Sequence, residues 1–174
     1  MWSCSVFKYG LKIKSKISLR RNIMAMTNEL SNDQISELLV YFTTFEETPD
    51  VKLVILKGNG RAFSVGGDVS AGAIDCINGH WSIGTNYLWH QFTLNYMIAT
   101  YSKPQVSILN GLVLGGGAGI SIHGKFRVAT ENAIFAMPET KIGHIPDVGS
   151  TYFLSRLVGY FGIDFQIYHH SSLN

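Results

Sequence analysis

The fold prediction for this chain depends most on residues 110–119, Asn-Gly-Leu-Val-Leu-Gly-Gly-Gly-Ala-Gly. This segment follows the apolar run 106–109, so a buried strand is expected to end in a glycine turn that starts a helix. About 50 residues earlier, the apolar run 51–57 precedes a second such segment, Gly-Arg-Ala-Phe-Ser-Val-Gly-Gly-Asp at 60–68. Glycine lets a backbone N–H approach a ligand closely. Two such groups that donate to one oxygen form an oxyanion hole, so the paired segments predict an anion-stabilising site.

Two carboxylates downstream are candidates for chemistry beside that site. Glu139 lies in Met137-Pro138-Glu139, and Asp147 precedes Val148-Gly149. A carboxylate near an oxyanion hole can act as a base or a nucleophile. The alternative interpretations are a solvated loop acid for Glu139 and an N-cap of the next helix for Asp147.

Strand and helix patterns alternate along the chain, which predicts an α/β fold with a largely parallel sheet. A capping box at Ser31–Gln34 starts the first amphipathic helix, whose apolar positions run from Ile35 to Phe45. Strands are expected at 51–57, 105–109, 126–130 and 133–135, and further helices at 85–100, 116–123 and 148–158.

Composition describes one globular domain. The chain has 174 residues, of which 46% are hydrophobic and 15% charged, with a net charge of +2. That charge is too small to indicate a nucleic-acid partner. Cys4 and Cys76 form neither a disulfide framework nor a metal pattern, which favours a reducing compartment. Residues 105–122 lack charge, but Gln105, Ser107 and Asn110 interrupt the segment, so it is not expected to span a membrane.

The remaining glycine and histidine patterns predict no cofactor site. A dinucleotide fingerprint that starts at Gly117 has Ile122 at its third glycine position. A phosphate loop ending at Gly124-Lys125 has Phe126 where a hydroxyl is required. His123 and His144 lie nearest the motifs, but no ligand set at metal-binding spacing accompanies them, so both are expected to form structural hydrogen bonds.

Several motifs carry a family resemblance between Ser31 and Gly162: GRAF-x-x-GGD, NG-x-x-x-GGG-x-G, HG-x-FR-x-ATE, FAMPET-x-IG, PDVG and YFLSRL. With these, the chain resembles the crotonase (enoyl-CoA hydratase/isomerase) superfamily, and most closely its 3-hydroxyisobutyryl-CoA hydrolase branch in the plant-like members. The resemblance implies a crotonase-like spiral core of repeated β-β-α units. It also implies C-terminal helices that close the acyl pocket. Residues 163–174 match none of these, so the C-terminal helical part is expected to be missing.

The resemblance assigns binding roles to backbone groups of the two glycine segments. The N–H groups of Gly67 and Gly116 would hold the thioester oxygen, and Gly116 would start a helix whose dipole favours an anion. Backbone groups around Ala62 and Ser64 would hold the adenine of coenzyme A, with Gly66 in the same substrate-binding loop.

The resemblance also assigns the catalytic roles. Glu139 would act as base on water or attack the thioester carbon, and Asp147 would assist. Hydratases of the superfamily carry a second glutamate where this chain has Gly119, so hydration of an enoyl thioester is disfavoured. Gln91 occupies the position of a glutamate that, in the hydrolase branch, recognises the substrate hydroxyl.

The function expected from this resemblance is hydrolysis of a 3-hydroxyacyl-CoA thioester, as in valine breakdown. Coenzyme A would enter as part of the substrate, with no other cofactor and no metal. The alternatives are a catalytically silent, truncated CoA-binding product and an enoyl-CoA hydratase or isomerase. The expected partners are the acyl-CoA, without nucleic acid or membrane, and possible association with itself or a full-length homologue.

Three segments are expected: a basic N-terminal segment over 1–30, a partial crotonase-like core over 31–162 and an unmatched tail over 163–174. Within the first, alternation from Leu11 to Leu19 indicates a strand, whereas Trp2, Val6, Tyr9, Ile13 and Ile17 have the helical spacing of a mitochondrial transit peptide. A mitochondrial location is therefore expected, with peroxisomal and cytosolic locations as alternatives. Without the capping helices, an apolar face is expected to be open to water, formed by Val106, Ile108, Val128 and Tyr152.

Overall fold

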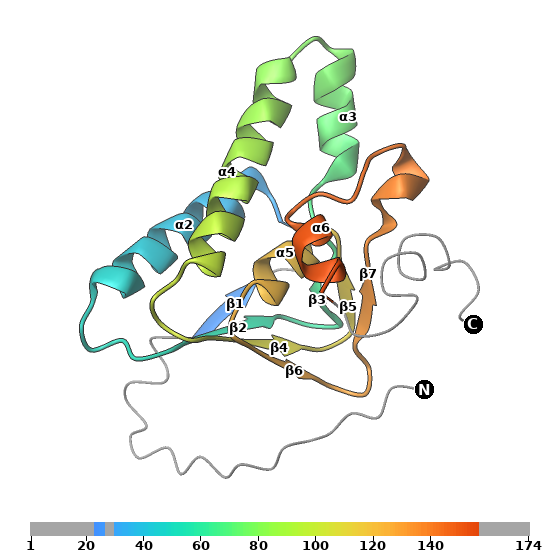
Figure 1. The fold of residues 1–174 in the computed structure, drawn as a ribbon. Coiled ribbons are helices and arrows are strands. Elements are labelled where there is room, and N and C mark those ends of the chain that lie inside the picture. Colours follow the sequence, from blue (N-terminus) through green and yellow to red (C-terminus); the bar gives the residue numbers. More distant parts are fainter. Residues whose placement is uncertain (1–22, 27–29, 157–174) are drawn as a thin grey trace.

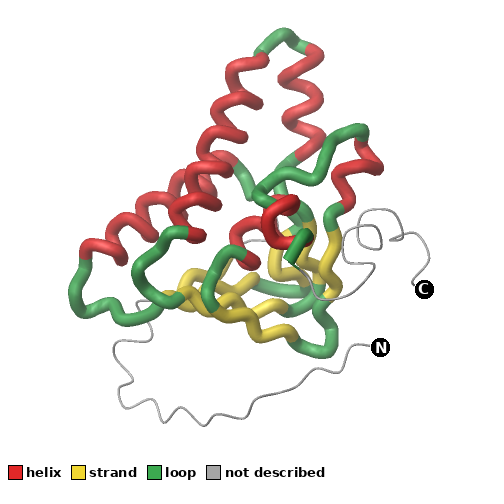
Figure 2. Tube along the Cα trace, viewed as in Figure 1, coloured by secondary structure: helices red, strands yellow, loops and turns green. Residues whose placement is uncertain are grey.

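The computed structural model describes residues 23–26 and 30–156. Within them the strands form two parallel sheets, shown in Figures 1 and 2. One sheet has the order β1-β2-β4-β6 and the other the order β3-β5-β7. The strands are β1 (Ile23–Met26), β2 (Val54–Gly58), β3 (Ala62–Ser64), β4 (Gln105–Leu109), β5 (Leu112–Leu114), β6 (Phe126–Ala129) and β7 (Ile134–Ala136).

Each turn of the chain contributes one strand to each sheet. β2 is followed by β3, β4 by β5 and β6 by β7, so the three turns stack in register through both sheets. This is the expected spiral of β-β-α units, and the α/β fold with parallel sheets is confirmed. The stacking places the turns that follow β3 and β5 next to one another.

The helices are α2 (Asn32–Glu47), α3 (Val69–Ile77), α4 (Trp81–Ala99), α5 (Gly116–Ile122) and α6 (Ser150–Leu154), with a 3-10 helix η1 (Pro138–Ile142). The predicted cap is confirmed, because the Ser31 hydroxyl accepts from the Gln34 amide at 3.3 Å. In Figure 1, α2, α4 and α5 lie on one side of the four-stranded sheet. The core fills the space between them, with Leu56 of β2, Phe42 of α2, Leu94 of α4 and Ile120 of α5 fully buried.

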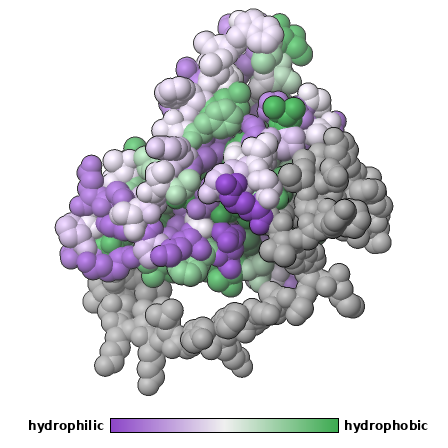
Figure 3. All heavy atoms as spheres, in the orientation of Figure 1, coloured by the Kyte–Doolittle hydropathy of each residue, from purple (hydrophilic) through white to green (hydrophobic). Residues whose placement is uncertain are grey.

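The opposite face of that sheet is less well covered. Val128 on β6 is 54% exposed, as expected for the open apolar face. Tyr152 is also exposed, at 59%, but it lies on α6, which borders the same cavity as α4 and α5, so it does not belong to that face. Val106 and Ile108 are only half-buried. A second apolar surface was not expected: the hairpin of α3 and α4, which projects from the sheets in Figure 1, exposes Ile77 and Trp89. Figure 3 shows apolar atoms on this projecting part.

Some expected elements differ in the structure. The final helix begins at Ser150 rather than at Val148, because Val148 (φ 44°) and Gly149 (φ 78°) have left-handed backbone. Helix α3 was not predicted, and none of its residues is buried. The short strands β3 and β5 were hidden inside the glycine segments. The expected strand from Leu11 to Leu19 lies outside the described residues.

Candidate active site

The two glycine turns meet at Gly66 and Gly116. A Cβ on Gly66, which has φ 87°, would lie only 3.2 Å from the amide nitrogen of Gly116. The approach follows from the parallel pairing of β3 with β5, which brings the two turns to the same end of the small sheet. Gly116 opens α5, so its N–H has no acceptor within the helix. The carbonyl oxygen of Gly66 accepts a hydrogen bond from the Leu30 amide at 2.8 Å.

Gly67 lies against a side chain that the sequence did not single out. A Cβ on Gly67 would collide with the hydroxyl of Tyr87 on α4. Tyr87, Gln91 and Asn95 are spaced four residues apart, so they follow one stripe of α4 toward the glycine turns. That spacing is the signal that could have identified Tyr87 and Asn95 from the sequence.

The first glycine segment is braced by its own side chains. Ser64 is buried, and its hydroxyl accepts from the Gly66 amide at 3.3 Å. Ala62, the first residue of β3, is also buried. The Asp68 carboxylate accepts from the Ala71 amide at 2.8 Å and caps α3.

Glu139 places its carboxylate against the second glycine turn. Its Oε1 atom is 2.8 Å from where a Cβ on Gly115 would stand, and Gly115 has φ 47°. Glu139 is 8% exposed and its Oε2 atom has no hydrogen-bond partner, so it is not a solvated loop acid. Burial raises the pKa of this carboxyl, and Asp147 raises it further, whereas its own backbone and His144 lower it. A buried, unpaired carboxylate beside a glycine turn is chemically suited to proton transfer.

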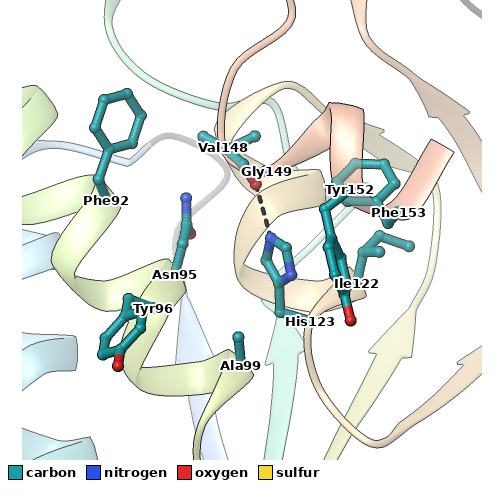
Figure 4. A pocket seen from close by; sticks show the side chains of 10 residues that line it. All are labelled: Phe92, Asn95, Tyr96, Ala99, Ile122, His123, Val148, Gly149, Tyr152 and Phe153. Atoms are coloured by element: carbon teal, nitrogen blue, oxygen red, sulfur yellow. Dashed lines mark hydrogen bonds between the residues drawn. The ribbon is translucent and has the colours of Figure 1, made fainter. Parts of the chain in front are cut away.

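Asp147 lies on the loop between η1 and α6. Its carboxylate is 3.5 Å from the imidazole of His144, and Gly149 rather than Asp147 is the N-cap of α6. The interpretation of Asp147 as the helix cap is therefore wrong. The loop is held from the other side by His123, whose Nε2 donates to the Val148 carbonyl at 2.7 Å (Figure 4).

Gly119 is the point where this loop packs onto α5. A Cβ at Gly119 would lie 2.6 Å from the Cβ of Val148 and 3.2 Å from Nδ2 of Asn95. Val148 is 3% exposed and fills this space. A glutamate at position 119 would therefore have no room, so the site cannot present a second carboxylate from α5 without displacing Val148.

Gln91 lies beside the second glycine turn. It is 1% exposed, and its Oε1 atom is 3.4 Å from the position that a Cβ on Gly116 would take. The Nε2 group donates to Oδ1 of Asn95 at 3.1 Å. The structure therefore brings Gln91, Glu139, Gly66 and Gly116 together around one turn.

A cavity of about 440 Å³ lies between α4, α5 and α6, as Figure 4 shows, and Gln91, Glu139 and the two glycine turns are not among its lining residues. Asn95 and Val148 separate it from Gly119, and its other walls are mainly apolar. Across the described residues, no group of three or more His, Cys, Asp or Glu side chains could hold a metal ion. No helix in the same part of the chain is long and apolar enough to cross a membrane.

The sequence model of one family, Enoyl-CoA hydratase/isomerase, matches residues 16–165. The chain belongs to this family. It is 63% identical over 135 residues to 3-hydroxyisobutyryl-CoA hydrolase 1 of Arabidopsis thaliana, covering 78% of this chain and 36% of that protein. It is 43% identical over 136 residues to the mouse (Mus musculus) protein "3-hydroxyisobutyryl-CoA hydrolase, mitochondrial", covering 78% and 35%.

Solved structures of the enoyl-CoA hydratase/isomerase family share the fold. The structure superposes on a carnitinyl-CoA dehydratase from Mycobacterium thermoresistibile with a TM-score of 0.76 and 35% identity, covering 82% of this chain and 44% of that one. The chain spans about a third of the length of the curated relatives that it matches.

Proposed function

We propose that this family member acts on a 3-hydroxyacyl-CoA thioester, with 3-hydroxyisobutyryl-CoA as the substrate, and hydrolyses it to the free acid and coenzyme A. The observation that carries the proposal is the position of the Glu139 carboxylate, 2.8 Å from the Cβ site of Gly115 at the turn where Gly66 meets Gly116. A buried carboxylate is thus adjacent to backbone N–H groups that suit a developing oxyanion. The similarity to the Arabidopsis hydrolase supports the same substrate class.

In the proposed reaction, the N–H groups of Gly67 and Gly116 hold the thioester carbonyl oxygen. Glu139 takes a proton from water, and the resulting hydroxide attacks the carbonyl carbon. The tetrahedral intermediate then collapses, the C–S bond breaks, and the thiolate of coenzyme A receives the proton that Glu139 took. Asp147 assists by its charge, which raises the pKa of Glu139 and so strengthens it as a base.

A direct route is the alternative for the same residue. Glu139 would attack the carbonyl carbon itself, expel the thiolate and form an anhydride that water then opens. A single turnover in ¹⁸O-labelled water separates the two routes. Direct attack followed by water attack at the Glu139 carbonyl leaves the label in the protein, whereas general-base catalysis places it only in the product.

Hydration of an enoyl thioester is not proposed. It requires a second acid on α5, and Val148 occupies the space into which a side chain at Gly119 would extend. A CoA-binding protein without catalysis is the competing function, and the assay below distinguishes the two.

The deciding experiment is an assay of CoA release from 3-hydroxyisobutyryl-CoA with a thiol reagent, using the purified chain. Release above the buffer rate that falls in Glu139→Gln supports hydrolysis. Binding without release favours the non-catalytic alternative, and absence of both contradicts the proposal. Crotonyl-CoA serves as the control substrate for hydration.

The location proposed for the chain is mitochondrial, supported by the mouse relative whose name gives that compartment. Self-association, or association with a longer homologue, is proposed from the exposed apolar side chains of the α3–α4 hairpin, such as Ile77 and Trp89. Sedimentation of the purified chain, alone and with a full-length relative, tests it.

A further inference from the structure

His144 connects the two candidate acids through its side chain and its backbone. Its Nε2 atom is 3.5 Å from Oδ2 of Asp147, and its amide donates to the carbonyl of Glu139 at 3.1 Å. The contact with Asp147 is an ion pair when the imidazole is protonated, and histidine is the side chain whose charge ordinarily changes between pH 5 and 8. A titratable group thus touches both acids.

The backbone of this loop holds the connection in place. Gly143 ends η1 with left-handed backbone, φ 76°, and this turn brings the His144 amide back to Glu139. Further along, the Asp147 carbonyl accepts from the Ser150 amide at 2.7 Å. The His144 and Asp147 side chains are 48% and 20% exposed, whereas Glu139 is buried. Protons therefore reach His144 from the solvent, while its charge acts on a buried group.

The charges of His144 and Asp147 act on Glu139 in opposite directions. Burial is the largest cause of the raised pKa of Glu139; the charge of Asp147 raises this pKa further, and that of His144 lowers it. Pairing of His144 with Asp147 therefore offsets part of the effect that Asp147 has on the buried carboxyl.

The other elements that surround this carboxylate, in the described part of the chain, bring little charge to it. The second glycine turn contacts it at Gly115, and the α4 side chain beside that turn is the neutral amide of Gln91. Lys141, on η1 with Glu139, is exposed, so solvent screens its charge. The loop that carries His144 is thus the main source of charge at Glu139.

We propose that His144 is a positioning residue that pairs with Asp147 and balances its charge, so that Glu139 stays ionised, and able to act as a base, at lower pH. This inference rests on the proposed function, because it concerns the base of the same hydrolysis. It also makes turnover respond to pH. Once His144 loses its proton, the Asp147 charge acts on Glu139 without compensation, and Glu139 becomes a stronger base that keeps its proton to higher pH.

The first test measures the protonation of Glu139 directly and needs no turnover. The ¹³C signal of its side-chain carboxyl is followed by NMR over a pH series in the full chain and is assigned by its loss in Glu139→Gln. His144→Leu and His144→Gln both remove the cation, so each should raise the proton affinity of Glu139 about two- to fivefold, the range that exposed ion pairs support. His144→Lys keeps a cation beside Asp147 and should leave the affinity near the wild-type value.

A matched control removes a histidine elsewhere. His80 is exposed before the start of α4 and forms no side-chain cap bond there, so His80→Leu should leave the proton affinity of Glu139 unchanged. A rise in His144→Lys equal to that in His144→Leu would show that the shape of the imidazole matters and its charge does not, which overturns the inference.

The second test is the pH profile of CoA release. In His144→Leu the acidic limb should move to higher pH, whereas the rate at high pH should not fall, because Glu139 is then ionised in both proteins. A merely structural role would lower the rate at every pH and leave the limb in place. Asp147→Asn removes the charge that His144 balances, so in that background His144→Leu should change the proton affinity of Glu139 by less than in the wild type.

The outcomes for the two proposals are distinct. An unchanged proton affinity of Glu139 in both neutral variants overturns the inference about His144, while CoA release by the wild type still supports hydrolysis. An equal effect of His144→Leu with and without the Asp147 charge overturns the positioning role, because His144 then acts on Glu139 alone. If the affinity changes as expected but no CoA is released, the proposed hydrolysis fails, and with it the role of His144 in turnover.

Discussion

The imidazole of His123 donates from Nε2 to the carbonyl of Val148 at 2.7 Å, joining the end of α5 to the loop that carries Asp147. Val148 is the only non-glycine residue in the described part of the chain with a positive φ, 44°. Left-handed backbone costs a β-branched residue about 1–2 kcal/mol, so the surrounding contacts must hold it. Those contacts are the His123 bond and the close packing of Val148 on Gly119.

Replacing His123 should loosen this loop. In His123→Phe the edge contact with Phe153, with ring centroids 5.7 Å apart, can persist while the bond to Val148 is lost. The free energy of unfolding should fall by about 1 kcal/mol, measured by urea denaturation. Amide exchange of residues 145–150 should become faster. His80→Phe, at an exposed position without a side-chain cap bond, is the control and should change neither quantity.

Gly119 should tolerate no side chain while Val148 is present. Gly119→Ala brings two Cβ atoms within 2.6 Å, so it should destabilise the fold by about 1–3 kcal/mol. Val148→Gly removes both the clash and the strained backbone, so the double variant should lose less stability than the sum of the singles. Gly72→Ala is the matched control, since a Cβ there meets nothing within 4 Å, and it should be neutral or slightly stabilising.

Glu139→Gln should abolish most of the proposed turnover. Loss of a base or nucleophile is expected to lower the rate of CoA release by about 10²-fold or more, with little change in substrate binding. The thiol assay measures the rate of CoA release. Isothermal titration with an analogue of 3-hydroxyisobutyryl-CoA, in which a methylene replaces the thioester sulfur, measures substrate binding. Glu131→Gln, at an exposed position, should behave as wild type. Retained turnover in Glu139→Gln would move the catalytic role to Asp147.

Because the pKa of Glu139 is raised, the stability of the folded chain should depend on pH. Above its usual value of 4.5 and up to the raised value, the folded state keeps a proton that the unfolded chain has released. The stabilisation by the neutral carboxyl is therefore full below that usual value and is lost as pH rises through the raised pKa. Glu139→Gln keeps a neutral side chain, so its melting temperature relative to wild type should rise as the pH increases from the usual value of 4.5 through the raised pKa. A pH-independent difference would contradict the buried, unpaired carboxylate.

Exposed apolar side chains should make the isolated chain bind the dye ANS at neutral pH. Ile77 is 84% exposed, and Trp89 on the neighbouring helix is 72% exposed. Exposed apolar surface favours dye binding and association. The double variant Ile77→Ser, Trp89→Ser should lower dye fluorescence and aggregation, whereas Ser82→Ala on the same hairpin should not. A soluble monomer with a sharp melt and no dye binding would contradict the prediction.

Much of the local structure could be predicted because it depends on residues close together in the chain. The Ser31 cap, strand β4 and helix α5 all follow from side-chain spacing and from where glycine stands. The bond between the Asp68 carboxylate and the Ala71 amide is of the same local kind, since the two residues are three positions apart. Helix α3 was not predicted; it follows directly on the first glycine segment, and none of its residues is buried.

By itself, the sequence determined that this chain is α/β, that two glycine turns follow strands, and that Glu139 and Asp147 are the acids to consider. The packed structure was needed to show that Tyr87 lies against Gly67 and Asn95 against Gly119, that Asp147 pairs with His144 instead of capping α6, and that Val148 fills the space above Gly119. The physical reason is that helix caps and turns depend on neighbouring residues. By contrast, burial, a raised pKa and steric exclusion arise where strands and helices distant in the sequence pack against one another.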